Sequence, residues 1–367
     1  MIKSNFVYVL CVCVCVCVFA GTLAKAGLEE SEITKVQTGG PDGDLGCNEI
    51  LMSKDKTVVI IDGSGVIYDP NGLNREELVR LATLRTMIVD FDPALLGEGG
   101  FKVLVGDTDV KLPTGEVVDS GLEFRNTFHL HPLCKADLFV PCGGRPEAVK
   151  LNDVPHMFLE DGTPKFKYIV EGANLFFSND ARMVLEQKGV TLYKDASTNK
   201  GGVTSSSLEV LAALALPEEK FASGMTVTDL DNLPEFYDSY TKDICNIVEN
   251  NADLEFECIH KEFLRTGQPR WLLTDIVSAK INELVQEINK SDLYNDEKLR
   301  ELVLKRSVPP TLQAECSMDE IVSNAPESYI KAIFSTYIAS RYIYQKGIDS
   351  NEFSFYDFMQ ELKNESQ

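Results

Sequence analysis

The sequence predicts an α/β protein in which a mostly parallel sheet is followed by a largely α-helical C-terminal region. The chain has 367 residues and is 44% hydrophobic, which is enough to bury at least one large core and predicts two domains. Short apolar runs alternate with helical periodicity up to about residue 216, and amphipathic stretches dominate afterwards. We therefore expect an apolar leader over 1–26, a sheet domain over 27–216 and a helical region over 217–367.

The strands are predicted from short apolar runs bounded by glycine, proline and polar residues. Lys56–Ile61 (KTVVII) is apolar throughout, which is typical of a parallel strand covered on both faces. A helix should follow, with Asn74 as its N-cap, Glu77 three residues on, and an inward apolar stripe. The other strands are expected at Ile33–Gln37, Phe101–Val105, Ala136–Pro141, Tyr168–Glu171 and Val190–Tyr193, with a helix between Ser178 and Gly189.

The helical region is predicted from three long amphipathic stretches separated by breaks. Gly267 and Pro269 interrupt the first pair, and Pro309-Pro310 lies before the last. The stretches are Glu235–Arg265, Trp271–Asn289 and Ser328–Gln345.

Charge and cysteine usage narrow the class of protein. The net charge of −22 disfavours binding to nucleic acid or to an anionic membrane. Four of the ten cysteines lie in one tract, Cys11 to Cys17, and the other six have no CxxC spacing or companion histidines, so we expect no metal site. The folded part is therefore expected in a reducing compartment.

The first 26 residues have two interpretations. Lys3, the apolar run Phe6–Phe19 and Ala24-Lys25-Ala26 follow the order of a secretory signal. The alternation of Val and Cys is also what a two-nucleotide GT repeat encodes, and translated low-complexity sequence is the preferred interpretation of the tract. The run is short for a membrane span, and a membrane-tethered protein is the least favoured alternative.

The turn TGGPDGDLG, Thr38–Gly46, follows the first strand and opens a helix. Its glycines, Gly40, Gly43 and Gly46, would let backbone amides approach a pyrophosphate at a helix N-terminus. The spacing is one residue longer than G-x-G-x-x-G, and a plain glycine-rich turn is the alternative.

Asp62 supports the nucleotide interpretation. It ends the second strand 22 residues after Gly40, where a carboxylate can accept the hydroxyls of an adenosine ribose. Such a carboxylate repels a 2′-phosphate, which indicates NAD rather than NADP. The alternative is that Asp62 only begins the turn Asp62–Gly65. Strand, glycine turn and acid in this order predict a Rossmann-like NAD-binding domain.

Further polar residues follow other predicted strands, where ligands bind in open α/β sheets. Cys142 and Gly143 follow one strand, and a backbone contact with a cofactor suits Cys142 better than a nucleophilic role. Asn174 and Asn199 could hold a ribose hydroxyl or a carboxamide, although Asn is often only a turn former.

The run KDASTNKGGVTSSS, Lys194–Ser207, brings glycines and hydroxyls to a predicted helix start near Thr204. Free amides and the three serine hydroxyls could bind an anion there. A serine-rich N-cap explains the same pattern.

Five blocks together resemble the large NAD-specific glutamate dehydrogenases of lower eukaryotes, over about residues 31–367. The blocks are KVQTGGPDGDLG, IIDGSGVIYDPNGL, FVPCGGRPE, YIVEGANLFF and KDASTNKGGVTSSSLEVLA. The resemblance implies oxidative deamination of L-glutamate to 2-oxoglutarate and ammonia, with NAD as hydride acceptor.

The resemblance also implies roles for single residues. The three turn glycines would hold the pyrophosphate, Asp62 the adenosine ribose, and Asn174 and Asn199 the nicotinamide end. Val203 and Ser206 match family positions that line the substrate side chain and its distal carboxylate. Lys200 stands where many smaller relatives have Ala, and its role is open.

The chain differs from the family in the part that precedes the matching residues. The family's glycine-rich lysine motif, catalytic lysine and catalytic aspartate belong to a domain upstream, and about 30 residues precede Lys35. We therefore nominate no catalytic residue and expect a fragment that is inactive alone. The alternative is a non-catalytic NAD-binding or oligomerisation module. The resemblance implies a homo-oligomer in the full-length family and a mitochondrial or cytoplasmic location, with secretory entry as the minor alternative.

Overall fold

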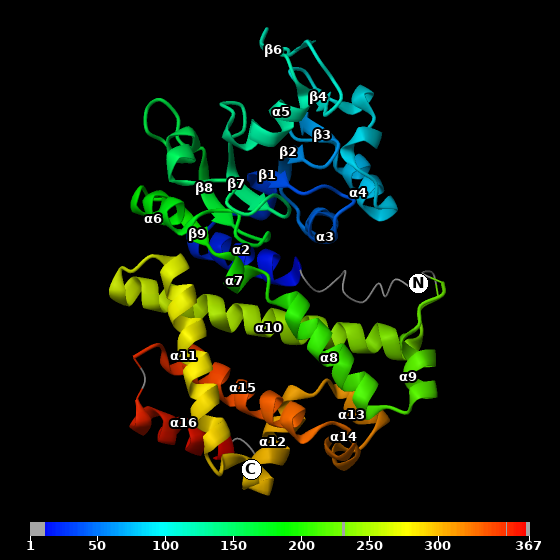
Figure 1. The fold of residues 1–367 in the computed structure, drawn as a ribbon, viewed down its shortest axis with the longest axis vertical. Coiled ribbons are helices and arrows are strands. Elements are labelled where there is room, and N and C mark those ends of the chain that lie inside the picture. Colours follow the sequence, from blue (N-terminus) through cyan, green and yellow to red (C-terminus); the bar gives the residue numbers. More distant parts are fainter. Residues whose placement is uncertain (1–11, 230–231, 350, 365–367) are drawn as a thin grey trace. The chain divides into compact units, whose positions relative to one another are not determined.

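The computed structural model describes residues 12–229, 232–349 and 351–364. The chain divides into two compact units. The sheet unit comprises Val14–Asn199 and Pro269–Trp271, and the helical unit comprises Lys200–Gln268 and Leu272–Gln367. Figure 1 labels most of the helices and strands of both.

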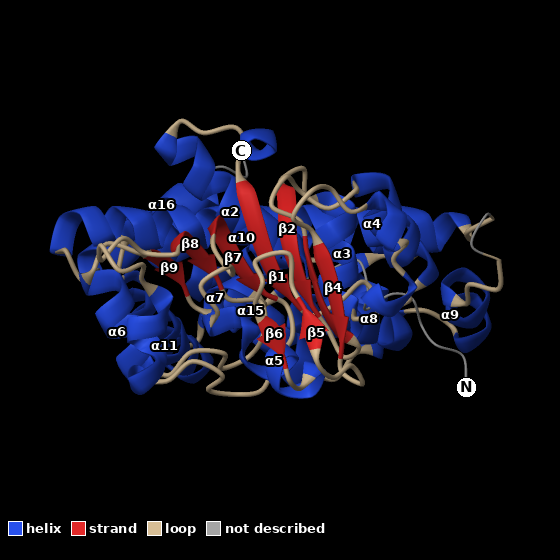
Figure 2. Cartoon of the chain, turned by 90° about the horizontal axis from the view of Figure 1, so that it is seen from above, coloured by secondary structure: helices blue, strands red, loops and turns tan. Residues whose placement is uncertain are grey.

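The sheet unit is built on a seven-stranded sheet of order β4-β3-β2-β1-β7-β8-β9. Five of its strands are parallel, and β3 and β4 join them antiparallel. Figure 2 shows the strands as one twisted sheet. The predicted mostly parallel sheet is confirmed. The strands are β1 (Thr34–Thr38), β2 (Lys56–Ile61), β3 (Gly65–Tyr68), β4 (Phe101–Leu104), β7 (Ala136–Pro141), β8 (Phe166–Val170) and β9 (Thr191–Tyr193).

The position of β1 creates the crevice in which a ligand can lie. The chain leaves β1 through α3 (Asp44–Met52) to β2 on one side, whereas β7 pairs with β1 on the other side. The strand order therefore reverses at β1. In open α/β sheets the ligand binds outside the carboxyl ends of the strands at such a point.

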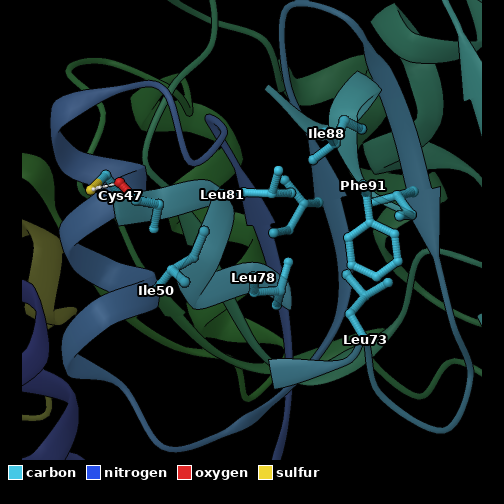
Figure 3. Close-up of a cluster of buried hydrophobic side chains, with 10 residues drawn as sticks. Cys47, Ile50, Leu73, Leu78, Leu81, Ile88 and Phe91 are labelled. Atoms are coloured by element: carbon cyan, nitrogen blue, oxygen red, sulfur yellow. Dashed lines mark hydrogen bonds between the residues drawn. The ribbon is translucent and has the colours of Figure 1, made fainter. Parts of the chain in front are cut away.

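The core beside β2 fixes the helices that flank this crevice. α4 (Arg75–Leu84) begins at the Asn74 cap, whose side chain accepts from the Glu77 amide at 3.0 Å. Its inward stripe of Leu78, Leu81 and Ala82 is fully buried, as predicted. These side chains pack with Cys47 and Ile50 of α3, and with Ile88 and Phe91 (Figure 3). The Cys47 thiol donates to the Ala82 carbonyl oxygen at 3.2 Å.

The rest of the sheet unit consists of short elements. The helix predicted between Ser178 and Gly189 is α6 (Asn179–Gln187), with Ser178 as its N-cap. A small antiparallel pair, β5 (Val110–Lys111) and β6 (Val117–Val118), lies in the β4–β7 connection. The other helices are α5 (Gly121–Thr127) and α7 (Asp195–Thr198), and the 3₁₀ turns are Glu30–Glu32, Ile88–Asp90, Pro93–Leu95, Phe128–Leu130 and Leu151–Met157.

The predicted leader falls partly on described residues. Residues 1–11 lie outside them, and α2 (Val12–Ala26) follows. Val18 and Leu23 of α2 are buried, at 2% and 3% exposure. No helix within the described ranges is both long enough and apolar enough to span a bilayer.

The helical unit confirms the three long amphipathic stretches as α10 (Glu235–Thr266), α11 (Arg270–Lys290) and α15 (Glu327–Lys346). It also takes up α8 (Gly201–Ala215), which the sequence assigned to the sheet domain. The reason is packing: Tyr240 of α10 donates its hydroxyl to the Leu208 carbonyl oxygen at 2.6 Å. The remaining helices are α9 (Glu218–Met225), α12 (Glu297–Ser307), α13 (Pro310–Glu315), α14 (Met318–Asn324) and α16 (Glu352–Asn364), with a 3₁₀ turn at Leu293–Asn295.

Candidate functional site

The turn between β1 and α3 is shaped by glycines that leave no room for a side chain. Gly39 has φ +85°, and a Cβ there would lie 2.7 Å from the Gly143 amide nitrogen. A Cβ on Gly40 would lie 2.5 Å from Oδ2 of Asp62, and one on Gly46 would collide with the carbonyl oxygens of Gly39 and Gly40. Gly43 differs, because its nearest neighbour would be 3.6 Å away. The tight positions are therefore 39, 40 and 46.

A second turn meets the first one at the edge of the sheet. The Cys142 amide, just after β7, donates to the Thr38 carbonyl oxygen at 2.7 Å. The Thr38 hydroxyl donates to the Gly143 carbonyl oxygen. The ends of β1 and β7 are thus bonded in both directions, which fixes the two glycine turns against each other.

These turns border a cavity of about 650 Å³, which we call the nucleotide cavity. Such a volume is within the ordinary range for small-molecule sites. It brings together six of the predicted residues: Gly40, Gly43, Gly46, Asp62, Cys142 and Gly143. It is also lined by residues that the sequence patterns did not single out, among them Gly39, Asp42, Arg125 and His129.

Asp62 is buried and already engaged by its own turn. Its Oδ1 accepts from the Ser64 amide and hydroxyl, both at 2.7 Å, and from the Gly65 amide at 3.3 Å. Its Oδ2 accepts from the Ile88 amide at 2.7 Å. Asp62 therefore forms the turn after β2, which was the alternative that the sequence left open. Its carboxylate also lines the cavity.

Asp42 is a second carboxylate in this cavity, and it is only partly buried. Burial raises its pKa, and the nearby charge of Asp62 raises it further. Asp42 follows Pro41 inside the glycine turn, so an acid within the turn was the signal that could have identified it. Two acids at one end of the cavity create a field that disfavours an additional phosphate.

Basic and aromatic groups complete the cavity. Arg125, on α5, donates from Nε to the Asp62 carbonyl oxygen at 2.6 Å. Burial lowers the pKa of His129, whose Nε2 lies 3.1 Å from the Ala148 carbonyl oxygen. A neutral imidazole can therefore donate that hydrogen bond.

Asn174 and Asn199 lie together in the sheet unit but outside the residues that line the nucleotide cavity. The Asn199 side-chain amide donates to Oδ1 of Asn174 at 2.5 Å and to the Gly172 carbonyl oxygen at 3.1 Å. The two amides thus hold each other at the carboxyl end of β8, where the sequence predicted the nicotinamide end.

A buried ion cluster supports this β8 loop. Both carboxylate oxygens of Glu171 accept from Arg182, at 2.7 and 2.8 Å, and both side chains are almost completely buried. Asp195 lies 3.7 Å from Arg182 and accepts from the Leu175 amide at 2.7 Å. Burial raises the pKa of Glu171 to about 7, although the pairing with Arg182 opposes the shift.

Val203 and Ser206 belong to the first turns of α8 in the helical unit. Val203 is 74% exposed. The Ser206 hydroxyl donates to the Gly202 carbonyl oxygen at 2.8 Å, and Ser205 and Ser207 also bond to backbone oxygens of their own helix. The N-cap position is Lys200, so the serines do not cap this helix.

No cluster of three or more metal-ligating side chains occurs within the described ranges. Comparisons with known proteins give consistent matches. A family model described as Glutamate/Leucine/Phenylalanine/Valine dehydrogenase matches residues 12–267. Glutamate dehydrogenase 2 of Dictyostelium discoideum is 55% identical over 94% of this chain, which covers 33% of that protein. The NAD-specific glutamate dehydrogenase of Neurospora crassa is 49% identical over 92% of this chain, which covers 32% of that protein.

Solved structures include a distant match. Plasmodium falciparum glutamate dehydrogenase superimposes with a TM-score of 0.47 and 15% identity, over 72% of this chain and 47% of that one. The chain thus spans about a third of the length of the curated relatives it matches.

Proposed function

Because the chain belongs to the glutamate/leucine/phenylalanine/valine dehydrogenase family, we propose that it is the NAD-binding portion of a glutamate dehydrogenase. The family predicted from the five sequence blocks is confirmed, and so is the prediction that only part of such an enzyme is present. Deamination of L-glutamate to 2-oxoglutarate is the activity of the proposed whole enzyme.

The observation that carries the proposal is the nucleotide cavity at the point where the strand order reverses. Gly39, Gly40 and Gly46 have no room for a Cβ, so glycine at these positions lets the turn pack tightly and keeps its backbone free of side chains, as close approach of a pyrophosphate requires. The first amides of α3 would hold its charge. The residues present therefore fit a dinucleotide.

Preference for NAD over NADP is proposed to come from two carboxylates. Asp62 is held by four hydrogen bonds, so it acts mainly through its charge and by placing the loop after β2. Asp42 borders the same cavity and is the more exposed of the two. A 2′-phosphate placed near both would be repelled.

We assign the nicotinamide end to Asn174 and Asn199, and substrate contacts to Val203 and Ser206. Bound NAD would accept a hydride from the substrate α-carbon. The role of this chain's residues is to bind and orient: the Glu171–Arg182 pair keeps the β8 loop in place for Asn174. General acid–base catalysis needs a positioned lysine and carboxylate. The resemblance assigns these to a part of the enzyme that this chain does not match.

The test is a fluorescence titration of the purified chain with NADH and NADPH. We expect NADH to bind, Asp62→Ala to weaken binding sharply, and glutamate-dependent NADH formation to be negligible. Equal affinity for NADPH would contradict the specificity assignment. Measurable glutamate turnover would contradict the assignment of the catalytic lysine and carboxylate to another part of the enzyme.

Sequencing the transcript upstream of Met1 addresses the non-catalytic alternative. An open frame that encodes a glycine-rich lysine segment supports a longer dehydrogenase. A stop codon directly upstream favours the NAD-binding module.

A further inference from the structure

The helical unit contains a second cavity of about 650 Å³, which we call the basic cavity. Its walls come from α8, α10, α12 and α15, and all of its lining residues belong to the helical unit. Its volume is sufficient for a small organic molecule. None of its lining residues borders the nucleotide cavity, but Val203, assigned above as a substrate contact, lies on its α8 wall.

The charge of this cavity differs from that of the chain as a whole. Lys305, Arg306 and Arg341 line it, in a protein of net charge −22. Asp243 is the carboxylate among its lining residues, and its Oδ2 already accepts from the Thr311 amide at 2.7 Å. The lining therefore carries an excess of positive charge, which favours an anion.

Arg341 is fixed in place by two neighbours. Its Nη2 donates to Oδ1 of Asn251 at 2.8 Å, and its guanidinium lies 5.1 Å from the centre of the Tyr337 ring. Its Nη1 is buried and has no hydrogen-bond partner among the described residues. Because Nη1 is closed off from solvent, Arg341 attracts an anion in the cavity through the charge of its guanidinium rather than through this nitrogen.

A smaller adjoining cavity helps to locate the anion. It has a volume of about 320 Å³ and shares Arg306, Tyr337 and Arg341 with the basic cavity. Its lining holds the carboxylates of Glu257 and Glu361 beside Lys261 and the two shared arginines, so its excess of positive charge is smaller than that of the basic cavity. The negatively charged group therefore belongs in the larger cavity.

We propose that the basic cavity binds a small organic anion through a carboxylate or phosphate group that pairs with Arg341. The amide of Asn251 holds the guanidinium, and Lys305 adds positive charge to the same lining. The body of the ligand lies among the tyrosine and aliphatic side chains of the wall. The site does not depend on NAD binding elsewhere in the chain.

The test is isothermal titration calorimetry of the full chain at low ionic strength. Citrate serves as the carboxylate probe and AMP as the phosphate probe, whereas L-glutamate is left out because Val203, on the wall of this cavity, is a proposed substrate contact. We expect at least one to bind and Arg341→Gln to weaken it about tenfold or more, as loss of a charge-assisted hydrogen bond implies. Arg265→Gln is the matched control: Arg265 is exposed and pairs with Glu262 and Asp349, so affinity should be retained.

Three results would overturn the proposal: no binding of any probe, equal binding by Arg341→Gln, or equal loss in both arginine variants. Asn251→Asp is a second variant that keeps a partner for Arg341 and adds a negative charge. It should abolish anion binding, and unchanged affinity in this variant contradicts the proposal even if Arg341→Gln fails to fold. NADH titration of each folded variant separates this site from the proposed nucleotide site, because NADH affinity should not change.

Discussion

The ammonium of Lys200 lies 2.6 and 2.7 Å from the two carboxylate oxygens of Glu255. Lys200 precedes α8, whereas Glu255 is buried on α10 and also accepts from the Tyr344 hydroxyl of α15 at 2.6 Å. The pKa of Tyr344 is raised by burial and by the charge of Glu255. The role that the sequence left open for Lys200 is therefore structural: it ties the start of α8 to two other helices.

Lys200→Met should destabilise the helical unit, because it leaves the Glu255 carboxylate buried without its cation. Lys200 is 38% exposed, so we expect a loss of about 1–2 kcal/mol in unfolding free energy rather than the larger cost of a fully buried pair. Urea unfolding followed by circular dichroism measures it.

Two further variants test that assignment. Lys242→Met is the matched control, because its pair with Asp238 is exposed and should cost less than about 0.5 kcal/mol. Adding Glu255→Gln to Lys200→Met should recover part of the loss. Equal losses for the two lysine variants would contradict the assignment.

Gly46→Ala should abolish tight NADH binding, because its methyl group would collide with the carbonyl oxygens of Gly39 and Gly40. We expect at least tenfold weaker binding and a lower melting temperature, since the turn must shift (about 1–3 kcal/mol). Gly106→Ala is the control, because a Cβ there would meet nothing within 4 Å and Gly106 does not line the cavity. If both variants bind alike, the tight turn does not hold the nucleotide.

Asp42→Asn should narrow the preference for NADH over NADPH. Removing one of two neighbouring negative charges lowers the repulsion of a 2′-phosphate, by about 1 kcal/mol or roughly fivefold to tenfold in relative affinity. Parallel titrations with both nucleotides measure the ratio. Asp44→Asn is the control, because Asp44 does not line the cavity. An unchanged ratio in Asp42→Asn would leave Asp62 as the specificity residue.

Glu171 should make stability depend on pH. Its folded pKa of about 7 exceeds the ordinary 4.5, so the folded state binds more protons between these values. Its contribution is therefore present below about pH 4.5 and is lost as pH rises through about 7, by up to the order of 3 kcal/mol. Glu171→Gln should remove this part of the slope, measured from urea midpoints between pH 5 and 8. Identical slopes in wild type and variant would contradict the raised pKa.

Local sequence patterns predicted most of the regular structure because its signals are local. The strands Lys56–Ile61 and Ala136–Pro141 were predicted to the residue, and Asn74 and Ser178 cap the expected helices. The antiparallel strand β3 was missed, since GVIY follows β2 after a tight turn and resembles its continuation. The assignment of α8 to the helical unit depends on its packing with α10.

The candidate site was predicted in part, because some of its signals are also local in the sequence. Glycines, acids and amides at strand ends can be read from the sequence, and six of them border one cavity. The tight approach at Gly39 could not be read, because it depends on Gly143 in a turn that is distant along the chain. Asp42 could be read as an acid within the glycine turn, but its closeness to Asp62 depends on the fold.

The sequence by itself determined the family, the mostly parallel sheet and the glycine turn, because these depend on residue types at short spacings. Tertiary structure alone decided that Asp62 is held by Ile88, that Lys200 is paired with Glu255, and that a buried nitrogen of Arg341 has no acceptor in the described part of the chain. Each depends on groups brought together from distant parts of the chain, and hydrogen bonds and ion pairs act only at the short distances that folding creates.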